Sequence, residues 1–392
     1  MNSTIDPSIA EERDLSLIRG GPFYRAQQAA RLIRPNEWNH VRRLAFALAL
    51  GWVPLVLITV FSQPEALMSL LRDYRVHSRM LIAVPVLLFG DLLLEKRFRM
   101  VVAQFARAGL LDSSDMAKMD DTIRWIQRLR DSVIPELTIL FLILIHGVIA
   151  FKIQVDTTAW LAHGTGSEIQ LTWAGWYAVV VSASMFQFLL GLALWKWLLW
   201  TLFAFRLSLL NLRLAPTHPD GHGGLGFLAL TPIAFTPTAF AATAVIAGTW
   251  RHEILHHGAN LMSFKLPAIV LAVIVALLAL APLLFFIPRL AAVRHDGILD
   301  YGLLAQIQVR AFHEKWILHG AGHETEFPAS AEGRTLSGFG QSYQRLVRMN
   351  PFPADKGTLV TLALSVAVPL LPLILSVIPI ATVLKLLLKA LR

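Results

Sequence analysis

The most unusual string of the sequence is Thr217-His218-Pro219-Asp220-Gly221-His222-Gly223-Gly224-Leu225-Gly226-Phe227. A glycine-rich turn ahead of a helix leaves backbone N–H groups pointing outward at the positive end of the helix dipole. An anionic lipid headgroup, a phosphate or a carboxylate solute would suit such a turn, because His218 and His222 can add positive charge. The predicted ligand-binding residues are therefore His218, Asp220, Gly221, His222, Gly223, Gly224 and Gly226.

Other interpretations of this string remain. Gly221, Gly223 and Gly226 match the spacing G-x-G-x-x-G, but no strand precedes them and a membrane span follows, which excludes a dinucleotide-binding turn. In a purely structural interpretation the glycines permit tight helix packing and a sharp turn, while the histidines and the aspartate cap helix ends. A metal site built from His218, Asp220 and His222 is a third interpretation.

A second string, Arg251-His252-Glu253-Ile254-Leu255-His256-His257, contains the pattern H-E-x-x-H. On a helix this spacing puts two imidazoles on one face with a carboxylate between them, as in zinc hydrolases. In this alternative His252 and His256 bind zinc and Glu253 is catalytic. The pattern also arises by chance in a chain with 13 histidines, and catalysis needs a third ligand and a cleft. We therefore expect no cofactor and a solvated turn here, and keep the zinc site as the alternative.

Three polar residues, Asp91, His146 and Gln187, fall inside apolar stretches. Polar groups within the membrane are costly and are therefore functional candidates. For Asp91 we favour snorkelling or pairing with a basic neighbour, for His146 a single hydrogen bond or a proton relay, and for Gln187 a bond to a neighbouring helix. No lysine or arginine is expected deep in a span.

The elements that must position these residues are seven apolar stretches. Hydrophobic residues make up 55% of the chain and charged residues 16%, against about 25% charged in soluble proteins. The runs are continuous rather than alternating, so they predict helices and not barrel strands. The expected fold is an all-α, polytopic transmembrane helical bundle with cytoplasmic amphipathic helices. The predicted spans are 44–61, 80–94, 133–151, 174–197, 227–250, 266–287 and 358–378.

The orientation follows from the basic residues. With the N-terminus in the cytoplasm, the inner segments hold 26 lysines and arginines and the outer segments 9, as the positive-inside rule requires. The net charge of +9 therefore reflects basic residues near anionic lipid headgroups and gives no support for a nucleic-acid partner. The expected partners are the bilayer and its anionic headgroups; a second copy or another membrane protein is compatible with this pattern. The chain has no cysteine, which excludes disulfides, thiolate metal sites and cysteine nucleophiles.

The chain divides into alternating membrane and cytoplasmic parts. Residues 95–131 should form a helical hairpin, whose first helix lies on the inner membrane surface and stops near Gly109, and whose second is capped by Asp112. Residues 319–343 should be a mobile loop, and the prolines 369, 372 and 379 should kink or break the last span. The predicted parts are a cytoplasmic arm (1–43), spans one and two (44–94), the hairpin (95–131), spans three to six with the turn at 217–227 (132–288), a cytoplasmic helix and loop (289–356), and the last span with an interfacial tail (357–392).

At the Thr217–Phe227 string the chain resembles a group of bacterial multi-span membrane proteins that share a THPDxxGGLGFL-type signature. The similarity extends to Gly20-Gly21-Pro22-Phe23-Tyr24, to Arg79-Met80-Leu81 through Pro85-Val86-Leu87, to Gly297 through Tyr301-Gly302, and to Phe312 with Lys315-Trp316. The resemblance implies a multi-pass protein of the bacterial inner membrane and brings no established activity, so it assigns no catalytic residue. The histidines of the second string are not part of this signature.

Three functional hypotheses follow. The first is a transporter or channel with a cytoplasmic anion or headgroup site at the Gly-rich turn. The second is a membrane scaffold or signalling protein that acts through its cytoplasmic helices. The third is a membrane metallohydrolase that uses the H-E-x-x-H string.

Overall fold

The structure is a computed structural model of the full chain. It describes residues 16–33, 39–153, 160–163, 170–318 and 331–375. In these ranges the chain is helical apart from its connections and one short pair of antiparallel strands. The predicted all-α, polytopic bundle is therefore confirmed.

Six helical stretches are long and apolar enough to cross a membrane. They are His40–Ser62, Tyr74–Arg107, Trp173–Ser208, Gly226–His257, Leu261–Leu284 and Lys356–Leu375. A seventh span arises if the bent pair Ser113–Asp131 and Ile134–Ile149, which meet at 42°, is counted as one. The multi-pass character of the chain rests on these helices.

The elements of the first half are α2 (Pro22–Ala29), α3 (His40–Gly51), α4 (Val53–Ser62), η1 (Pro64–Ala66), α5 (Leu67–Leu71), α6 (Tyr74–His77), η2 (Ser78–Ala83), α7 (Val84–Arg107), α8 (Ser113–Asp131) and α9 (Ile134–Ile153). The strands β1 (Ala162–His163) and β2 (Gln170–Leu171) follow. The second half holds α10 (Trp173–Tyr177), η4 (Ala178–Ala183), α11 (Ser184–Ser208), η5 (Gly226–Ala229), α12 (Leu230–Ala234), α13 (Thr236–His257), η6 (Leu261–Phe264), α14 (Lys265–Leu284), α15 (Ile287–Phe312), η7 (His313–Leu318), α16 (Ala331–Val347) and α17 (Lys356–Leu375).

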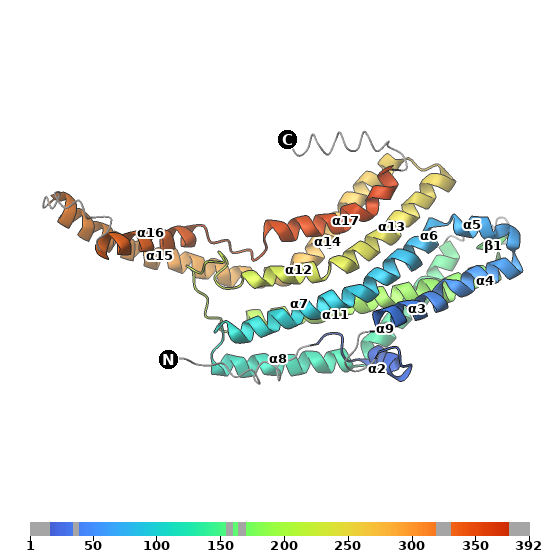
Figure 1. The fold of residues 1–392 in the computed structure, drawn as a ribbon, viewed down its shortest axis with the longest axis horizontal. Coiled ribbons are helices and arrows are strands. Elements are labelled where there is room, and N and C mark those ends of the chain that lie inside the picture. The colour runs from blue at the N-terminus through green and yellow to red at the C-terminus, as the bar shows by residue number, and fades with distance from the viewer. Residues whose placement is uncertain (1–15, 34–38, 154–159, 164–169, 319–330, 376–392) are drawn as a thin grey trace.

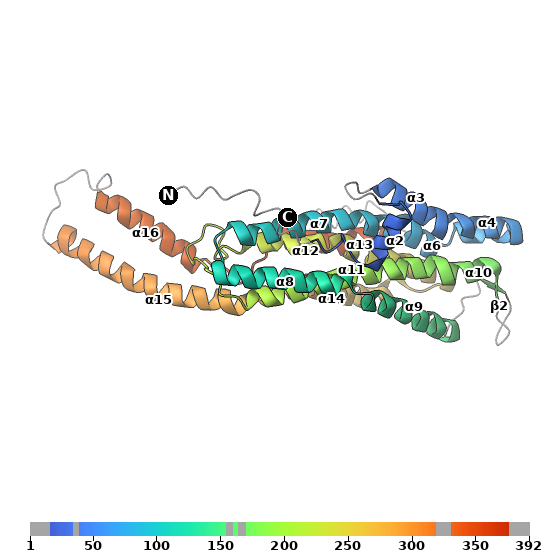
Figure 2. The ribbon, with the colours of Figure 1, turned by 90° about the horizontal axis from the view of Figure 1, so that it is seen from below.

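The long helices run beside one another along the long axis of the molecule (Figure 1). Helix α13 packs against α17, α7 and η2, and α11 packs against α8 at one end and α9 toward the other. Seen from below, α9 diverges from the bundle, whereas α8 stays close to α11 (Figure 2). At one end α15 and α16 project as a hairpin (Figure 1).

Residues 95–107, expected to form a separate helix on the membrane surface, instead continue the second span within α7. Their apolar face is covered by protein: Phe98 is fully buried and stacks on Trp200, with ring centroids 4.3 Å apart. Phe105 is also fully buried and meets the edge of Phe227. An amphipathic stripe does not specify whether lipid or protein covers it, and here protein does. The predicted stop is confirmed, since Gly109 adopts φ +65° just beyond α7.

The following helix begins where the sequence predicts. The Asp112 side chain accepts the backbone N–H of Asp115 at 2.8 Å and caps α8. Helices α7, α8 and α11 then enclose the largest apolar core, together with α12 and the junction of α14 and α15. This core lies at the end of the bundle from which α15 and α16 project (Figure 1).

Two expectations for the last third of the chain need correction. Residues 331–343, expected to belong to a mobile loop, are part of α16, and this helix packs on α15. Phe339 stacks against Tyr301 with ring centroids 6.2 Å apart, and residues 319–330 lie outside the described ranges. Helix α17 runs through Pro369 and Pro372 without ending, so these prolines do not break the described part of the last span; the alternative, a kink, stays a prediction. Pro379 and the tail lie outside the described residues.

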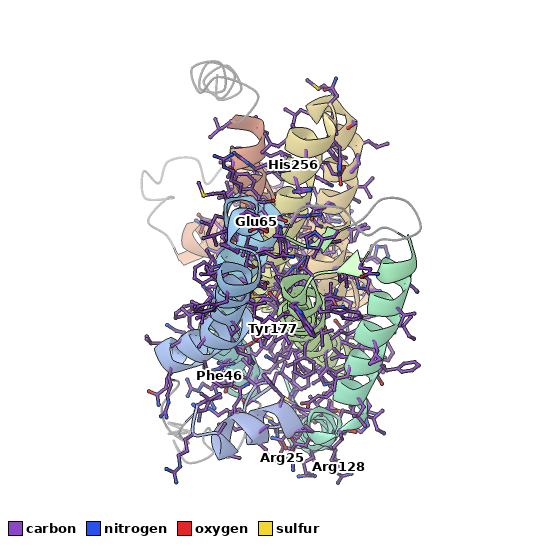
Figure 3. The ribbon with its side chains drawn as sticks, turned by 90° about the vertical axis from the view of Figure 1, so that its right-hand side faces the viewer. Arg25, Phe46, Glu65, Arg128, Tyr177 and His256 are labelled. Carbon is purple, nitrogen blue, oxygen red and sulfur yellow. The ribbon has the colours of Figure 1, made fainter. Side chains whose placement is uncertain are left out.

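The arm before the first span is tied to the rest of the chain at the predicted Gly20-Gly21-Pro22 turn. The backbone N–H of Gly21 donates to Asp131 and that of Phe23 donates to Glu136, both at 2.9 Å. Figure 3 shows Arg25 and Arg128 together at the edge formed by α2 and α8, opposite His256. The arm is thus anchored to α8 and α9.

Candidate functional site

The Gly-rich turn folds around its own carboxylate. Asp220 accepts the backbone N–H groups of His222 and Gly226 at 2.8 Å and that of Gly224 at 3.1 Å. The ring of His218 lies 2.8 Å from the same carboxylate. Burial alone would raise the pKa of Asp220, but these donors outweigh it and hold the pKa below its usual value. N–H groups that we expected to face an anionic ligand therefore have an internal anion.

The glycines of the turn are needed for its shape. Gly221, Gly223 and Gly224 all adopt positive φ, which side chains rarely tolerate. A Cβ at Gly226 would lie 3.0 Å from the Asp220 carboxylate. His222 and Gly221 also bond the backbone of Asn350, which joins the turn to the segment before α17. This geometry favours the structural interpretation of the string, and ligand binding at the turn stays a prediction.

The H-E-x-x-H string does not converge on one point. His252 is almost fully buried, and its Nδ1 lies 3.8 Å from Asp73. Glu253 is half exposed and pairs with His257 at 2.8 Å. His256 is exposed, and its ring centroid lies 4.3 Å from that of His252. Within the described ranges, no group of three or more histidine, aspartate or glutamate side chains could hold a metal ion. The zinc alternative stays untested.

Asp91 is paired, as one of our two interpretations predicted, but with residues distant in sequence. Its carboxylate lies 2.6 Å from Nζ of Lys196 on α11 and 3.2 Å from Nη2 of Arg43 on α3. All three side chains are largely buried. We name these residues the Asp91 cluster. Arg43, Arg79 and Lys196 fall within the helical stretches of three candidate spans; the expectation that no lysine or arginine lies deep in a span stays a prediction.

A cavity of about 210 Å³, lined by both apolar and polar residues, lies between η2, η4 and the middle of α9. Both η2 and η4 are π-helical turns inserted into long α-helices. Such turns are rare and occur often at functional sites. We call this space the Arg79 cavity. Its polar lining residues are Asp73, Arg75, Arg79, His146, Ser182, Ser184 and Gln187, and Trp160 covers one side.

Several hydrogen-bond donors face this cavity. Among the described residues Arg79 forms no ion pair or hydrogen bond with another side chain. The hydroxyl of Ser182 is 1% exposed and has no partner there either. His146 and Gln187 bond each other across α9 and α11 at 3.1 Å, which confirms the predicted interhelical bond of Gln187. The cavity thus collects two of the three predicted intramembrane polar residues.

The carboxylate of Asp73 lies at one end of the cavity and is fully engaged. Arg75 approaches its two oxygens at 3.2 and 3.0 Å, and the indole N–H of Trp160 donates to it at 3.1 Å. Burial would raise the pKa of Asp73, but the Arg75 hydrogen bond and charge, with His252 nearby, lower it overall. Asp73 therefore carries a negative charge that Arg75 balances, and its carboxylate holds Arg75 and Trp160 in place.

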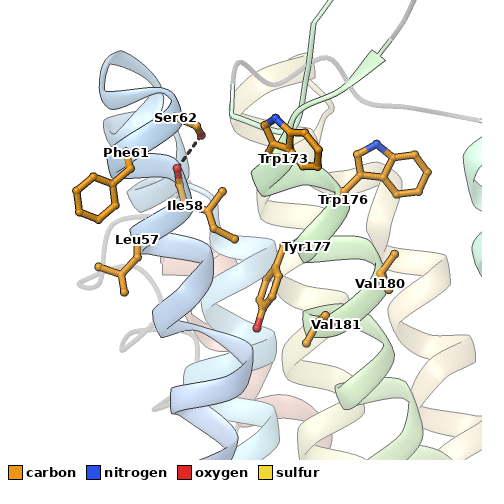
Figure 4. A pocket seen from close by; sticks show the side chains of 9 residues that line it. All are labelled: Leu57, Ile58, Phe61, Ser62, Trp173, Trp176, Tyr177, Val180 and Val181. Carbon is orange, nitrogen blue, oxygen red and sulfur yellow. Dashed lines mark hydrogen bonds between the residues drawn. The ribbon is translucent and has the colours of Figure 1, made fainter.

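A wider groove lies elsewhere and is apolar. It measures about 720 Å³ and runs between α4 and the helical stretch from α10 into η4 (Figure 4). Ile58 of α4 points toward Tyr177 across it (Figure 4), and none of its nine lining residues is charged. The Tyr177 hydroxyl donates to the backbone of Leu50. This groove offers contact for apolar chains and no group for catalysis.

Sequence analysis did not identify Arg79, Arg75, Asp73 or Ser182 as site residues. Arg75, Arg79 and Asp73 lie in a segment that was assigned to an outer loop, because the second span was predicted to begin at residue 80. In the structure the helical stretch begins earlier, at Tyr74. Ser182 and Ser184 resembled ordinary small residues of a span. An arginine next to the apolar run at 80–94 was the available signal.

The fold and this geometry define a polytopic all-α membrane protein with a partly open cavity to which seven polar residues contribute. No protein-family model matches the sequence, and neither a curated protein nor a solved structure shows significant similarity to it. The resemblance to the THPDxxGGLGFL-type group therefore stays a prediction.

Proposed function

We propose that the protein is a transporter of a small polar solute in the bacterial inner membrane and that the Arg79 cavity is its binding site. The observation that carries the proposal is the set of donors around Arg79 and Ser182 that no described residue satisfies. Unsatisfied polar groups are costly in a membrane interior. A ligand that supplies their partners would offset that cost.

We also propose the orientation with a cytoplasmic N-terminus, on the strength of the positive-inside rule. In this orientation the Arg79 cavity lies in the outer half of the bundle, and Trp160 and Leu161 form part of its lining. The core around Phe98, α8 and the α15–α16 hairpin then lie on the cytoplasmic side. The Gly-rich turn is also cytoplasmic and, in this proposal, supports the inner end of the bundle.

The route inward from the cavity is closed by an apolar layer. On the second span Met80, Val84 and Leu87 separate Arg79 from Asp91, and all three are buried in one cluster with Phe186. Arg79 and Asp91 are roughly 18 Å apart along the helix, at 1.5 Å per residue. A solute would have to displace this layer and then pass the Asp91 cluster. That arrangement favours a carrier with alternating access over an open channel.

Filling the cavity tests the proposal. Gly147 on α9 lines it, and a Cβ at this position meets no atom within 4 Å. The variant Gly147→Leu therefore adds bulk at the cavity without a close contact at its Cβ. Gly340→Leu on α16 is the matched control, because it also lies in a helix and a Cβ there meets no atom within 4 Å. Both replace a helical glycine with a residue of higher helix propensity.

The measurement is counterflow into proteoliposomes with radiolabelled phosphate, acetate, glycine, glycerol and rubidium. We expect protein-dependent uptake of at least one of them, reduced about tenfold or more by Gly147→Leu and unchanged by Gly340→Leu. No uptake of any solute by the parent protein would contradict the proposal. Equal uptake by the parent and Gly147→Leu would place the route elsewhere.

One observation favours the scaffold hypothesis as a second candidate function. Leu299, Leu303 and Ile307 recur at four-residue spacing on α15 and are each more than half exposed. Exposed apolar stripes of this kind are typical of contact surfaces, so a second copy or another membrane protein would suit this face. Leu303→Lys should then lower the mass of the purified particle measured by light scattering and leave transport unaltered.

A further inference from the structure

We propose that the Arg79 cavity binds a small anion with oxygen acceptors, such as a carboxylate or a phosphate-like oxyanion. The inference deepens the proposed function because it names the ligand class of the same cavity. Binding can be tested without transport, so the two proposals can fail separately.

The charges around the cavity leave one positive charge in excess. Asp73 is the sole carboxylate among the described residues that line the cavity, and Arg75 holds both of its oxygens. That pair is neutral together. Arg79 remains, with no carboxylate at ion-pair distance among the described residues. A guanidinium in a membrane bundle is stabilised most by an anion that it can bind with two parallel hydrogen bonds.

The neutral groups of the cavity are also donors. The buried Ser182 hydroxyl has a proton to donate and no acceptor in the described structure. The amide nitrogen of Gln187 bonds Nδ1 of His146. Because the amide donates, Nδ1 must accept, and a neutral ring then carries its proton on Nε2. Arg79, Ser182 and His146 come from three separate helical segments and all line this one cavity.

Cations and large ligands fit the cavity less well. A cation would need acceptors, and the carboxylate of Asp73 already receives Arg75 and Trp160. The volume of about 210 Å³ suits a compact anion better than a nucleotide or a lipid headgroup with its glycerol.

The experiment uses the purified full-length protein in detergent and titrates potassium phosphate, sulfate, acetate and chloride. Isothermal calorimetry gives the affinity. We expect at least one oxyanion to bind. Arg79→Gln should weaken it by about tenfold or more, as expected when a charged hydrogen bond is lost. Ser182→Ala should weaken it about three- to tenfold.

Matched controls separate the site from general effects. Arg72→Gln removes an exposed arginine outside the cavity. Thr243→Val removes another buried hydroxyl that lacks a partner in the described structure and does not line the cavity. Both controls should keep the affinity within twofold of the parent. If Arg79→Gln does not fold, the comparison of Ser182→Ala with Thr243→Val still decides the question.

The outcomes are distinct. If none of the four anions binds, or if Ser182→Ala and Arg79→Gln bind as tightly as the parent, the anion site is wrong. Counterflow of glycerol or rubidium without oxyanion binding would overturn the ligand class and leave the transporter standing. Oxyanion binding with the expected losses, but without counterflow of any solute, would support the site and overturn transport.

Discussion

The Gly-rich turn and the Arg79 cavity both gather hydrogen-bond donors, and they differ in where the acceptor comes from. In the turn, Asp220 receives three backbone N–H groups and the His218 ring. In the cavity, the Ser182 hydroxyl and the Arg79 guanidinium find no acceptor among the described residues. The turn is therefore complete without a ligand, whereas the cavity is not.

The difference shows that an unusual sequence motif need not be a ligand site, and that a site with unsatisfied hydrogen-bond donors need not contain an unusual motif. Glycine, histidine and aspartate make residues 217–227 stand out, yet their chemistry is used to fold the turn. The cavity is built from residues that are distant in the sequence. They become notable only when the hydrogen-bond partners of each polar side chain are known. Buried polar groups are normally hydrogen-bonded, so the exceptions are the more informative signal.

The largest effect on folded stability is expected at the Asp91 cluster, a third polar group, whose charges are paired within the protein. Asp91→Asn would leave the buried Lys196 and Arg43 without their shared counter-ion, and breaking such a pair costs about 3–5 kcal/mol. We expect a loss of this size in the free energy of unfolding, measured by titration with a denaturing detergent. Glu65→Gln, an exposed carboxylate, should change it by less than about 0.5 kcal/mol. A stability loss below about 1 kcal/mol in Asp91→Asn would mean that the cluster is not an essential ion pair.

The variant Asp220→Ala would remove the acceptor of the Gly-rich turn and leave its backbone donors unsatisfied, as in the Arg79 cavity. Three N–H groups would lose their acceptor, at about 1 kcal/mol each, so we expect a loss of about 2–3 kcal/mol. Added phosphate or acetate should recover part of it in Asp220→Ala and not in the parent, because the anion can then enter the vacated position. Asp121→Ala removes an exposed carboxylate and should cost less than about 1 kcal/mol.

The pH dependence of the same variant follows from the lowered pKa of Asp220. The folded protein binds its proton less readily than the unfolded chain, so the stabilisation is complete above the usual pKa of 3.8 and fades as the pH falls through the lower folded value. The stability difference between the parent and Asp220→Ala should be constant near neutral pH and shrink below about pH 4. A difference that shrinks between about pH 6 and 7 would point to histidine instead.

Much of the fold could be predicted because apolar length and continuity specify membrane helices directly. The Asp112 cap and the Gly109 stop were also predictable, since each depends on neighbouring residues alone. The straight course of α7 was not, because the stripe of Phe98, Val101 and Phe105 fits either lipid or protein. What covers such a stripe is decided by Trp200 and other partners far away in sequence.

The same reason limits prediction of the site. Asp91, His146 and Gln187 could be selected because each is polar within an apolar run, and the structure pairs Gln187 with His146. Their other partners come from tertiary packing: Arg43 and Lys196 meet Asp91 from different helices. Arg79 became a site residue only once its helix was found to begin at Tyr74.

The smallest expected effect on stability belongs to Ser182→Ala, and it sharpens the comparison most. The hydroxyl has no partner in the described structure, so its removal breaks no hydrogen bond and relieves a buried donor of its desolvation cost. Without added ligand we expect a change within about 1 kcal/mol of zero, or a slight gain. With phosphate or acetate present, the parent should gain stability that Ser182→Ala does not match, whereas Thr243→Val should match it. Equal gains in all three proteins would mean that Ser182 faces no anion, and the cavity would then be as complete as the turn.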